Sequence, residues 1–327
     1  MKKAFFVTMI VLMLAPLMPA SGVNAESKTS FKISVSQFVE HPALDAVLKG
    51  FQNYMKGKQI EVIYSIHNAQ ANMATANQIA SQIMGESPDL ILAIATPTSQ
   101  AIAQALKKAP QMQNTPFLFT AVTDPISAGL VKDLEHPGKN ITGVSDLLPV
   151  DKHMKMLKTF LPNLKNLGVL YNSGEANSKK TVEMIRKEGK KLGFTVTDGT
   201  ISKSSEVYQA AKSLVGRVDA VFVPTDNTVV SALESAIKVC SQNKLPLFCA
   251  DVDSVARGAV AAMGFDYYKH GYQTGDMALR ILNGAKAGKT PVETQRELQL
   301  HINLKYAKLM GVIVPELLLS AADKVYR

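Results

Sequence analysis

The pattern of the whole chain is set by one stretch, Asp89-Leu-Ile-Leu-Ala-Ile-Ala-Thr-Pro-Thr-Ser-Gln-Ala-Ile-Ala-Gln-Ala-Leu-Lys-Lys108. Its first part, 89–95, is a continuous apolar run, which predicts a strand buried on both faces. Hydroxyl side chains follow at Thr96, Thr98 and Ser99, and 98–108 has the composition of a helix. A buried strand that leads through a polar turn into a helix indicates a parallel sheet covered by helices.

The same alternation of short strands and amphipathic helices extends in both directions from this stretch. Pro149 interrupts the alternation, which then begins again. We therefore expect an α/β protein with two parallel-sheet, Rossmann-like lobes. In the first half the predicted strands are 31–38, 59–66, 89–95, 116–122 and 140–146, and the helices are 42–56, 71–84 and 98–108. In the second half the strands are 166–171, 194–201, 219–223 and 245–250, and the helices are 178–192, 206–215 and 229–242.

The C-terminal part departs from this repeat. It predicts a short strand at 259–264, a helix at 268–283, a half-buried strand at 297–304 and a terminal helix at 315–326. An extra helix and strand after a second lobe suggest that the chain returns across the hinge, with crossings near 147, 266 and 291. We assign 26–147 and 267–291 to lobe 1, and 148–266 and 292–327 to lobe 2.

The N-terminus has the features of a signal peptide. Lys2 and Lys3 precede an apolar run, 4–17, and Val23-Asn24-Ala25 resembles a signal-peptidase site. The run is shorter than the roughly 20 residues that span a bilayer, although a retained anchor is the alternative. We expect cleavage after Ala25 and a periplasmic protein, and no cysteine near this site could accept a lipid.

Composition and charge narrow the function. With 46% hydrophobic and 19% charged residues the chain is globular, and loss of Lys2 and Lys3 would lower its formal charge from +9 to +7. The excess of basic residues is spread along the chain in pairs such as Lys107-Lys108, Lys179-Lys180 and Lys190-Lys191, without interleaved aromatic residues. This argues for a solvated lysine surface and against nucleic acid, while the positive field could help to recruit an anionic ligand. We expect a monomer.

The two cysteines lie in a predicted helix and the strand after it. Cys240 and Cys249 could form a disulfide in an oxidising compartment, or remain as buried, unreactive thiols. Neither has the spacing of a metal or redox site. We expect neither a metal nor a cofactor.

Polar side chains gather where predicted strands end, which is where parallel α/β sheets bind ligands. Each could instead be a helix cap. The argument for a ligand is that both halves place hydroxyl, amide and carboxylate groups at this edge. In the first half they include Gln37, Thr96, Thr98, Thr123 and Asp124, and in the second Asn172, Ser173, Glu175, Thr225, Asp226 and Asp251.

Catalytic motifs are missing from the sequence. It has no Gly-x-Ser-x-Gly, no glycine-rich phosphate loop and no His-Glu-x-x-His, and its six histidines share no short motif. The sequence does not exclude a glycosidase-like pair of carboxylates. Because the chain contains no tryptophan to stack on a sugar ring, a sugar-binding cleft is the less favoured interpretation. We therefore expect a binding protein rather than an enzyme.

The strand-end motifs resemble those of the substrate-binding proteins of bacterial ABC importers, in particular the aromatic amino-acid (tryptophan-type) binding proteins. The resemblance covers essentially the whole mature chain. It rests on Ile94-Ala-Thr-Pro-Thr-Ser, Phe119-Thr-Ala-Val-Thr-Asp-Pro, Asn140-Ile-Thr-Gly-Val-Ser-Asp, Leu170-Tyr-Asn-Ser-Gly-Glu-Ala-Asn-Ser, Val223-Pro-Thr-Asp-Asn and Gly264-Phe-Asp-Tyr.

The resemblance implies a type I periplasmic binding fold, with two lobes joined by three hinge crossovers that close on one small ligand and deliver it to a membrane permease. It carries over the strand-end residues named above, together with Phe265. For an amino acid we assign the carboxylate to Thr96, Thr98 and Ser173, the ammonium to Asp226 or Asp251, and the side chain to Phe38 and Phe265. Another small solute such as a different amino acid or a purine-like compound, a sensory module that presents ligand to a receptor, and a secreted α/β hydrolase are the alternatives.

Overall fold

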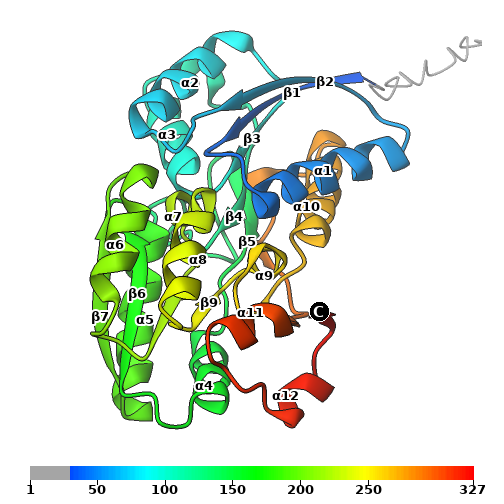
Figure 1. Ribbon diagram of the computed structural model, residues 1–327. Coiled ribbons are helices and arrows are strands. Elements are labelled where there is room, and N and C mark those ends of the chain that lie inside the picture. Colours follow the sequence, from blue (N-terminus) through cyan, green and yellow to red (C-terminus); the bar gives the residue numbers. More distant parts are fainter. Residues whose placement is uncertain (1–29) are drawn as a thin grey trace, which may run out of the picture.

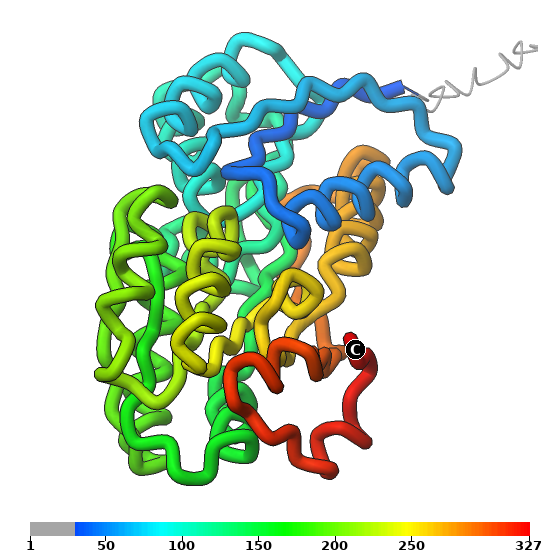
Figure 2. Tube along the Cα trace, in the orientation of Figure 1, coloured from blue at the N-terminus to red at the C-terminus, as the bar shows by residue number. Residues whose placement is uncertain are grey.

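The computed structural model describes residues 30–327, and the predicted signal peptide, 1–25, lies outside this range (Figure 1). The chain forms two lobes, each built on one sheet. Figure 2 shows that the trace builds most of one lobe first, passes into the other, and returns to the first lobe with one long helix before it ends in the second. The expectation of two α/β lobes with parallel sheets is confirmed.

Lobe 1 contains a six-stranded parallel sheet in the order β11-β5-β4-β3-β1-β2. Helices α1 and α10 pack together over one face, and α2 and α3 pack together over the other. The strands are β1 (Ser30–Gln37), β2 (Glu61–Asn68), β3 (Leu90–Ile94), β4 (Phe117–Val122), β5 (Ile141–Ser145) and β11 (Glu293–Thr294); the helices are α1 (Pro42–Gly57), α2 (Met73–Glu86), α3 (Thr96–Leu106) and α10 (Tyr267–Leu282).

Lobe 2 contains a seven-stranded sheet in the order β13-β12-β10-β9-β8-β6-β7, in which only the pair β10–β12 is antiparallel. Helices α4 and α5 pack side by side, as do α6 and α8. The strands are β6 (Asn166–Asn172), β7 (Thr195–Ile201), β8 (Ala220–Val223), β9 (Leu247–Cys249), β10 (Ala261–Gly264), β12 (Gln299–Asn303) and β13 (Lys324–Tyr326). The helices are α4 (Val150–Phe160), α5 (Ala176–Leu192), α6 (Val207–Leu214), α7 (Asn227–Ser231), α8 (Leu233–Gln242), α9 (Asp253–Arg257), α11 (Leu304–Leu309) and α12 (Glu316–Ser320).

Each lobe has its own hydrophobic core, which explains the continuous apolar runs in the sequence. Phe117 and Phe119 of β4 are fully buried in lobe 1, as are Phe222 of β8 and Phe248 of β9 in lobe 2. The contact between α1 and α10 is so close that a Cβ at Gly271 would lie 1.9 Å from the carbonyl oxygen of Val47. Glycine is therefore required there by space rather than by backbone angle.

The chain passes between the lobes three times: from β5 to α4, from β10 to α10, and from β11 to β12. The third passage differs from the predicted boundary at 291, because Glu293 and Thr294 pair with Val144 and Ser145 in the lobe 1 sheet. The third connection between the lobes starts only where the pairing of β11 with β5 ends. The last part of lobe 2 therefore begins after β11 rather than at residue 292.

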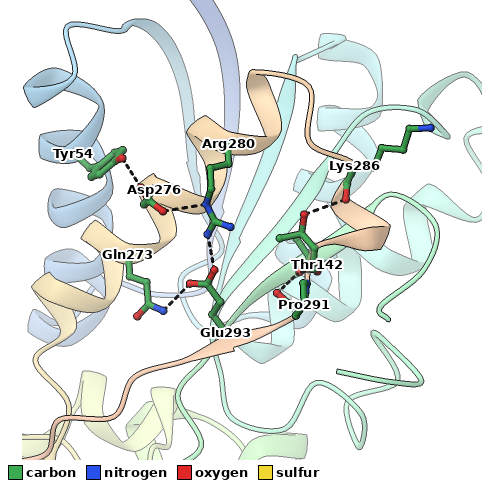
Figure 3. Close-up of polar contacts among 9 residues, drawn as sticks. Tyr54, Thr142, Gln273, Asp276, Arg280, Lys286, Pro291 and Glu293 are labelled. Atoms are coloured by element: carbon green, nitrogen blue, oxygen red, sulfur yellow. Dashed lines mark hydrogen bonds and ion pairs between the residues drawn. The ribbon is translucent and has the colours of Figure 1, made fainter. Parts of the chain in front are cut away.

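Side chains of lobe 1 hold this returning segment (Figure 3). Glu293 accepts hydrogen bonds from Arg280 Nη2 at 2.5 Å and Gln273 Nε2 at 2.8 Å, both on α10. Arg280 Nε also donates to Asp276, which accepts from Tyr54 of α1 at 2.6 Å. Because α1, α10 and β11 share one polar network, β11 is fixed to lobe 1.

Two predicted elements differ in the structure, and helices α4, α9 and α11 were not predicted. The helix expected at 229–242 is divided into α7 and α8 at Ala232, and the helix expected at 315–326 is replaced by α12 and the edge strand β13. Helix α4 follows directly after Pro149, where we expected no element. Short elements at the chain end depend on contacts with β12 that local sequence does not reveal.

Candidate functional site

A cavity lies between the lobes at the carboxyl ends of the parallel strands, as expected for this sheet architecture. Its empty volume is about 340 Å³, including space open to solvent. Lobe 1 lines it with His41, Ala43, Leu44, Ala121, Thr123, Asp146 and Tyr267, and lobe 2 with Asn177, Thr225, Asp226, Asn227, Val230 and Asp251. The lining contains three carboxyl groups and no lysine or arginine, so the cavity favours a ligand with a positively charged group.

Asp146 is the carboxyl group that lobe 1 contributes. It follows β5, and its two oxygens accept hydrogen bonds from Thr123 Oγ1 at 3.1 Å and from Tyr267 Oη at 2.8 Å. Burial raises the pKa of the Asp146 carboxyl above its ordinary value. These two donors orient the carboxyl group, and its remaining lone pairs can accept from a ligand.

Asp251 is the corresponding carboxyl group of lobe 2, directly after the end of β9. It accepts from the backbone N–H of Ser254 at 2.9 Å and from Ser254 Oγ at 2.7 Å. Burial raises the pKa of Asp251 as well. Burial and then the nearby carboxyl groups of Asp146 and Asp251 raise the pKa of Tyr267 well above its usual range. Tyr267 lines the same cavity as both carboxyl groups.

The third carboxyl group, that of Asp226, accepts more hydrogen bonds from the protein itself than the other two do. It caps α7 through Val229 N at 2.8 Å and accepts from Asn172 N and Ser178 Oγ, both at 2.6 Å. Burial, and then the nearby charge of Glu175, raise the pKa of Asp226 far above that of an exposed aspartate. These three bonds give Asp226 a structural function at the base of the cavity.

His41 supplies an imidazole at the start of α1. Its Nδ1 accepts from the backbone N–H of Leu44 at 3.5 Å. Against the larger effect of burial, the side chain of Asn227, which lies near the ring, raises the pKa of His41, but Nε2 has no partner within hydrogen-bond geometry in residues 30–327. Burial lowers the pKa of His41 to about 3, so the ring is neutral at physiological pH. Because Nδ1 is an acceptor, the neutral ring carries its proton on Nε2 and offers a free donor.

Two alanines at the cleft edge of lobe 1 adopt positive φ angles. Ala95, before α3, has φ 86° and ψ 157°, and Ala121, in the irregular part of β4, has φ 51°. Such conformations are costly for residues with a Cβ and are concentrated at binding sites. Ala121 is held by a hydrogen bond of 3.1 Å from its N–H to His270 Nε2 of α10.

Two pairs of side chains connect the lobes across the cleft. Thr225 Oγ1 lies 3.2 Å from Thr123 Oγ1 and is the donor, because Thr123 gives its own proton to Asp146. Asp124 Oδ2 and Lys180 Nζ form an ion pair at 3.4 Å. The lobes are therefore in direct polar contact, as in a closed cleft.

Of the ligand residues predicted from sequence, Thr123, Thr225, Asp226 and Asp251 line the cavity. The first strand's Gln37 instead donates to Val39 O and Asp45 Oδ1, and Phe38 lies in the lobe 1 core. Asp124 caps a turn at Ile126 and Ser127 in addition to pairing with Lys180.

The hydroxyl groups assigned to a ligand carboxylate lie elsewhere. Thr98 Oγ1 donates to Ile94 O at 3.0 Å, so its proton is used by the end of β3. Thr96 is buried with its hydroxyl unpaired among the described residues, and Ser173 is exposed; neither lines the cavity. A binding function for these three residues stays a prediction, and the geometry favours other donors.

The remaining predicted residues do not line the cavity but stabilise the elements that surround it. Glu175 accepts from both the N–H and the hydroxyl of Thr228 and so holds the start of α7. Asn172 Nδ2 donates to Thr228 Oγ1 at 2.9 Å. Phe265 is buried in the lobe 2 core rather than in the cavity.

The structure describes Cys240 and Cys249 as free, buried thiols, which is the second of the two alternatives. Within residues 30–327 no cluster of His, Cys, Asp and Glu could hold a metal ion. No helix in the same range is long and apolar enough to cross a bilayer.

Several lining residues were not predicted as ligand residues. His41 precedes Pro42 and so has the sequence of a helix cap, while Tyr267 follows a chain crossover. Asp146, Asn177 and Asn227 are among the polar residues at predicted strand ends and lie within the quoted motifs, but they were not assigned to the ligand. The signal that could have identified them was their position beside Ser145, Asn172 and Asp226 at the same sheet edges.

A two-lobed α/β protein with a polar cavity between its lobes is a binding protein of the type I periplasmic class, as predicted. The chain belongs to the ABC transporter substrate-binding protein family, whose profile it matches over residues 32–326. Members of this family bind small molecules and work with ABC permeases, and they are not enzymes.

Three relatives place the chain within the family. It is 43% identical over 292 residues to the tyrosine-binding protein of Clostridioides difficile, covering 87% of this chain and 82% of the relative. It is 34% identical to an ABC domain from Streptococcus pneumoniae solved in complex with L-Trp, with a TM-score of 0.85, covering 90% of this chain and 99% of that one. It is 40% identical to a ligand-free, open substrate-binding protein with adhesive properties from Clostridium difficile, with a TM-score of 0.66 and coverages of 90% and 99%.

Proposed function

We propose that this protein binds an aromatic amino acid such as tyrosine or tryptophan between its lobes and delivers it to the permease of an ABC importer. One contrast carries the proposal. The chain superposes better on the L-Trp complex, at 34% identity, than on the ligand-free open protein, at 40% identity. The two lobes are therefore arranged more as in the L-Trp complex than as in the open protein. The tyrosine-binding relative supports the same ligand class.

The ammonium group of the ligand binds between Asp146 and Asp251. Both carboxyl groups line the cavity, both lie near Tyr267, and each comes from a different lobe. An ammonium ion that contacts both would stabilise the closed state selectively, because the open state separates the two carboxyl groups. Asn177 Oδ1, which is buried without a hydrogen-bond partner in the described chain, adds a third acceptor.

The carboxylate of the ligand binds to a neutral donor. The cavity contains no cation, and the donor that it presents is the unpaired Nε2–H of His41, because the one hydroxyl proton of Thr225 is donated to Thr123. Leu44, Ala121 and Val230 provide apolar surface for the aromatic side chain, and Tyr267 provides a ring. This assignment replaces the earlier one to Thr96, Thr98 and Ser173, which do not line the cavity.

Calorimetry with L-tyrosine, L-tryptophan and L-leucine tests the ligand class. We expect the two aromatic amino acids to bind more tightly than leucine. Asp251→Asn should weaken binding by more than about 25-fold, the scale for removing one partner of a buried charge pair. Glu183→Gln, which removes an exposed carboxylate on α5, is the charge-matched control. Failure of all three amino acids to bind the folded parent protein would exclude this ligand class, whereas unchanged binding by Asp251→Asn would exclude only the ammonium assignment.

We also propose that the protein is exported, with residues 1–25 as a cleaved signal peptide. The family is typically extracytoplasmic, and the N-terminal sequence has the charged, apolar and small-residue regions of such a peptide. N-terminal sequencing of protein released by osmotic shock should give Glu26 as the first residue. A membrane-bound product that retains residues 1–20 would contradict this.

A further inference from the structure

The positive charge of this protein is concentrated on one face of one lobe. Residues 151–192, which include α4 and α5, contain ten Lys and Arg against four Asp and Glu, a formal net charge of +6. The parts of the chain that form lobe 1, 30–147 and 266–295, contain twelve of each and are neutral. Almost the entire net charge of the mature chain therefore lies in these 42 residues.

Helices α4 and α5 pack beside each other on the lobe 2 sheet, so their outward sides form one surface (Figure 1). The buried residues of both helices face the core, and the charged residues occupy the opposite sides. We call this surface the α4–α5 face. Its basic residues are Lys152, Lys155 and Lys158 on α4, Lys179, Lys180, Arg186, Lys187, Lys190 and Lys191 on α5, and Lys165 in the connection from α4 to β6, next to Leu164, whose carbonyl oxygen accepts from Lys158.

Half of these basic side chains have no partner within the described chain. Lys155, Lys180, Arg186 and Lys191 form ion pairs, and Lys158 donates to backbone carbonyls. The other five side chains are exposed and form no ion pair or hydrogen bond among residues 30–327; they are Lys152, Lys165, Lys179, Lys187 and Lys190. Among the residues that the structure describes, these five charges are not paired in ion pairs, although the carboxylate of Asp151 lies near Lys152.

We propose that the α4–α5 face binds the anionic headgroups of a phospholipid bilayer. A protein partner is less suitable, because none of the large hydrophobic side chains that are exposed in the described chain lies on α4 or α5. Protein interfaces need such an apolar centre and are depleted in lysine. Nine of the ten basic residues are lysines, which act as point charges and suit a diffuse layer of phosphate groups better than a shaped, bidentate site.

The location of the face agrees with this function. Lys180 reaches Asp124 across the cleft, so the N-terminal end of α5 lies at the cleft rim, while Lys187 and Lys190 lie towards its other end. Attraction to the bilayer through lobe 2 would leave the neutral lobe 1 free to move. The receptor would then stay close to the membrane without a covalent anchor.

Sedimentation of the full mature chain with lipid vesicles tests the proposal. At low salt we expect binding to vesicles of phosphatidylcholine and phosphatidylglycerol in equal parts, and none to pure phosphatidylcholine. Binding should weaken at about 0.15 M salt, where charges are screened beyond about 8 Å. Since each lysine near an anionic surface strengthens binding by about fivefold, replacing Lys152, Lys165, Lys187 and Lys190 by Gln should reduce it by more than about 100-fold.

A matched variant controls for total charge. Lys56, Lys58, Lys107 and Lys108 are exposed on lobe 1, and their replacement by Gln removes the same number of charges. This variant should bind the anionic vesicles nearly as well as the parent. Equal loss in both variants, or no binding of the parent to anionic vesicles, would overturn the proposal. Capture of an acidic protein by the parent without vesicle binding would assign the face to a protein partner instead. Amino-acid binding, measured on the same samples, should be unchanged in both variants.

Discussion

Lys180 Nζ lies 3.4 Å from Asp124 Oδ2, and this ion pair joins the two lobes at the rim of the cleft. The lysine comes from α5 of lobe 2 and the aspartate from the turn after β4 of lobe 1. Their side chains are 37% and 18% exposed, so water screens the attraction only in part. Opening of the cleft must separate the pair, and the interaction therefore contributes to the closed state alone.

Lys180→Gln should weaken amino-acid binding by roughly two- to fivefold, the effect of losing a partly exposed ion pair. The ligand contacts stay intact, so the loss reflects a smaller closed population. The neighbouring Lys179→Gln, which removes an exposed and unpaired lysine, is the control. Calorimetry on both variants should separate them, and an equal effect would show that general charge rather than this pair is responsible.

Binding of the amino acid should weaken as the pH falls from neutral into the acidic range. Asp146 and Asp251 must be ionised to hold an ammonium group, but burial raises the pKa of both carboxyl groups in the unliganded protein. Acidification therefore neutralises them at a higher pH than exposed aspartates. Titrations between pH 7 and pH 4 should show this loss, with proton release on binding at the lower end. Constant affinity over this range would contradict the ammonium assignment.

Gly271→Ala should destabilise the protein by more than about 3 kcal/mol, because its Cβ would overlap the backbone of Val47 and force α1 and α10 apart. The matched control is Gly85→Ala. Gly85 lies in α2 with no neighbouring atom within 4 Å of a Cβ, so this change should stabilise the helix by about 0.5–1 kcal/mol. Denaturant unfolding measures both. A stable Gly271→Ala variant would show that the two helices can separate without cost.

Much of this architecture could be predicted from sequence, because polar residues that follow buried strands predict which side chains lie at the same edge of the sheet. The lining residues Thr123, Thr225, Asp226 and Asp251 each follow a buried strand, and periodicity predicts such strands well. The direction in which a strand-end side chain points could not be predicted from the sequence. Thr98 has the same local sequence context as a ligand donor, yet its hydroxyl turns back to Ile94 O at the end of β3.

Residues brought in by crossovers could not be predicted in this way. Tyr267 reaches Asp146 although 121 positions separate them, and only the return of α10 to lobe 1 makes this contact. Similarly, β11 contains two residues and has no recognisable strand pattern, but its pairing with β5 decides where lobe 1 ends. Both cases depend on tertiary contacts rather than on local preference.

The buried histidines should make the protein sensitive to acid. Burial lowers the pKa of His270 from 6.5 to about 4, below that of the unfolded chain. Its stabilising contribution is therefore complete above pH 6.5 and is lost as the pH falls through about 4, by up to about 3 kcal/mol. In His270→Gln the free energy of unfolding should fall less between these pH values than in the parent, since glutamine can still accept from Ala121 N. Parallel pH profiles would contradict this explanation.

Cys240 and Cys249 should resist thiol reagents in the folded protein. Both are fully buried, and burial raises the pKa of Cys240 to about 12 and the pKa of Cys249 well above its ordinary value. Thiolates are therefore scarce at neutral pH. We expect no reaction with a thiol-specific reagent under native conditions and two labelled thiols after denaturation. An intact mass two protons lighter, without labelling after denaturation, would instead reveal a disulfide.

The attachment of β11 to lobe 1 limits how far the lobes can move apart. Arg280 and Gln273 hold Glu293, so the third connection between the lobes is free only from Gln295 to Leu298, before β12 begins. Four extended residues span at most about 14 Å. The second connection contains only Phe265 and Asp266. Such short connections oppose translation and twisting of the lobes but allow rotation about a line through the three crossovers. The receptor therefore opens by hinge rotation, and the length of these connections limits how far it can open.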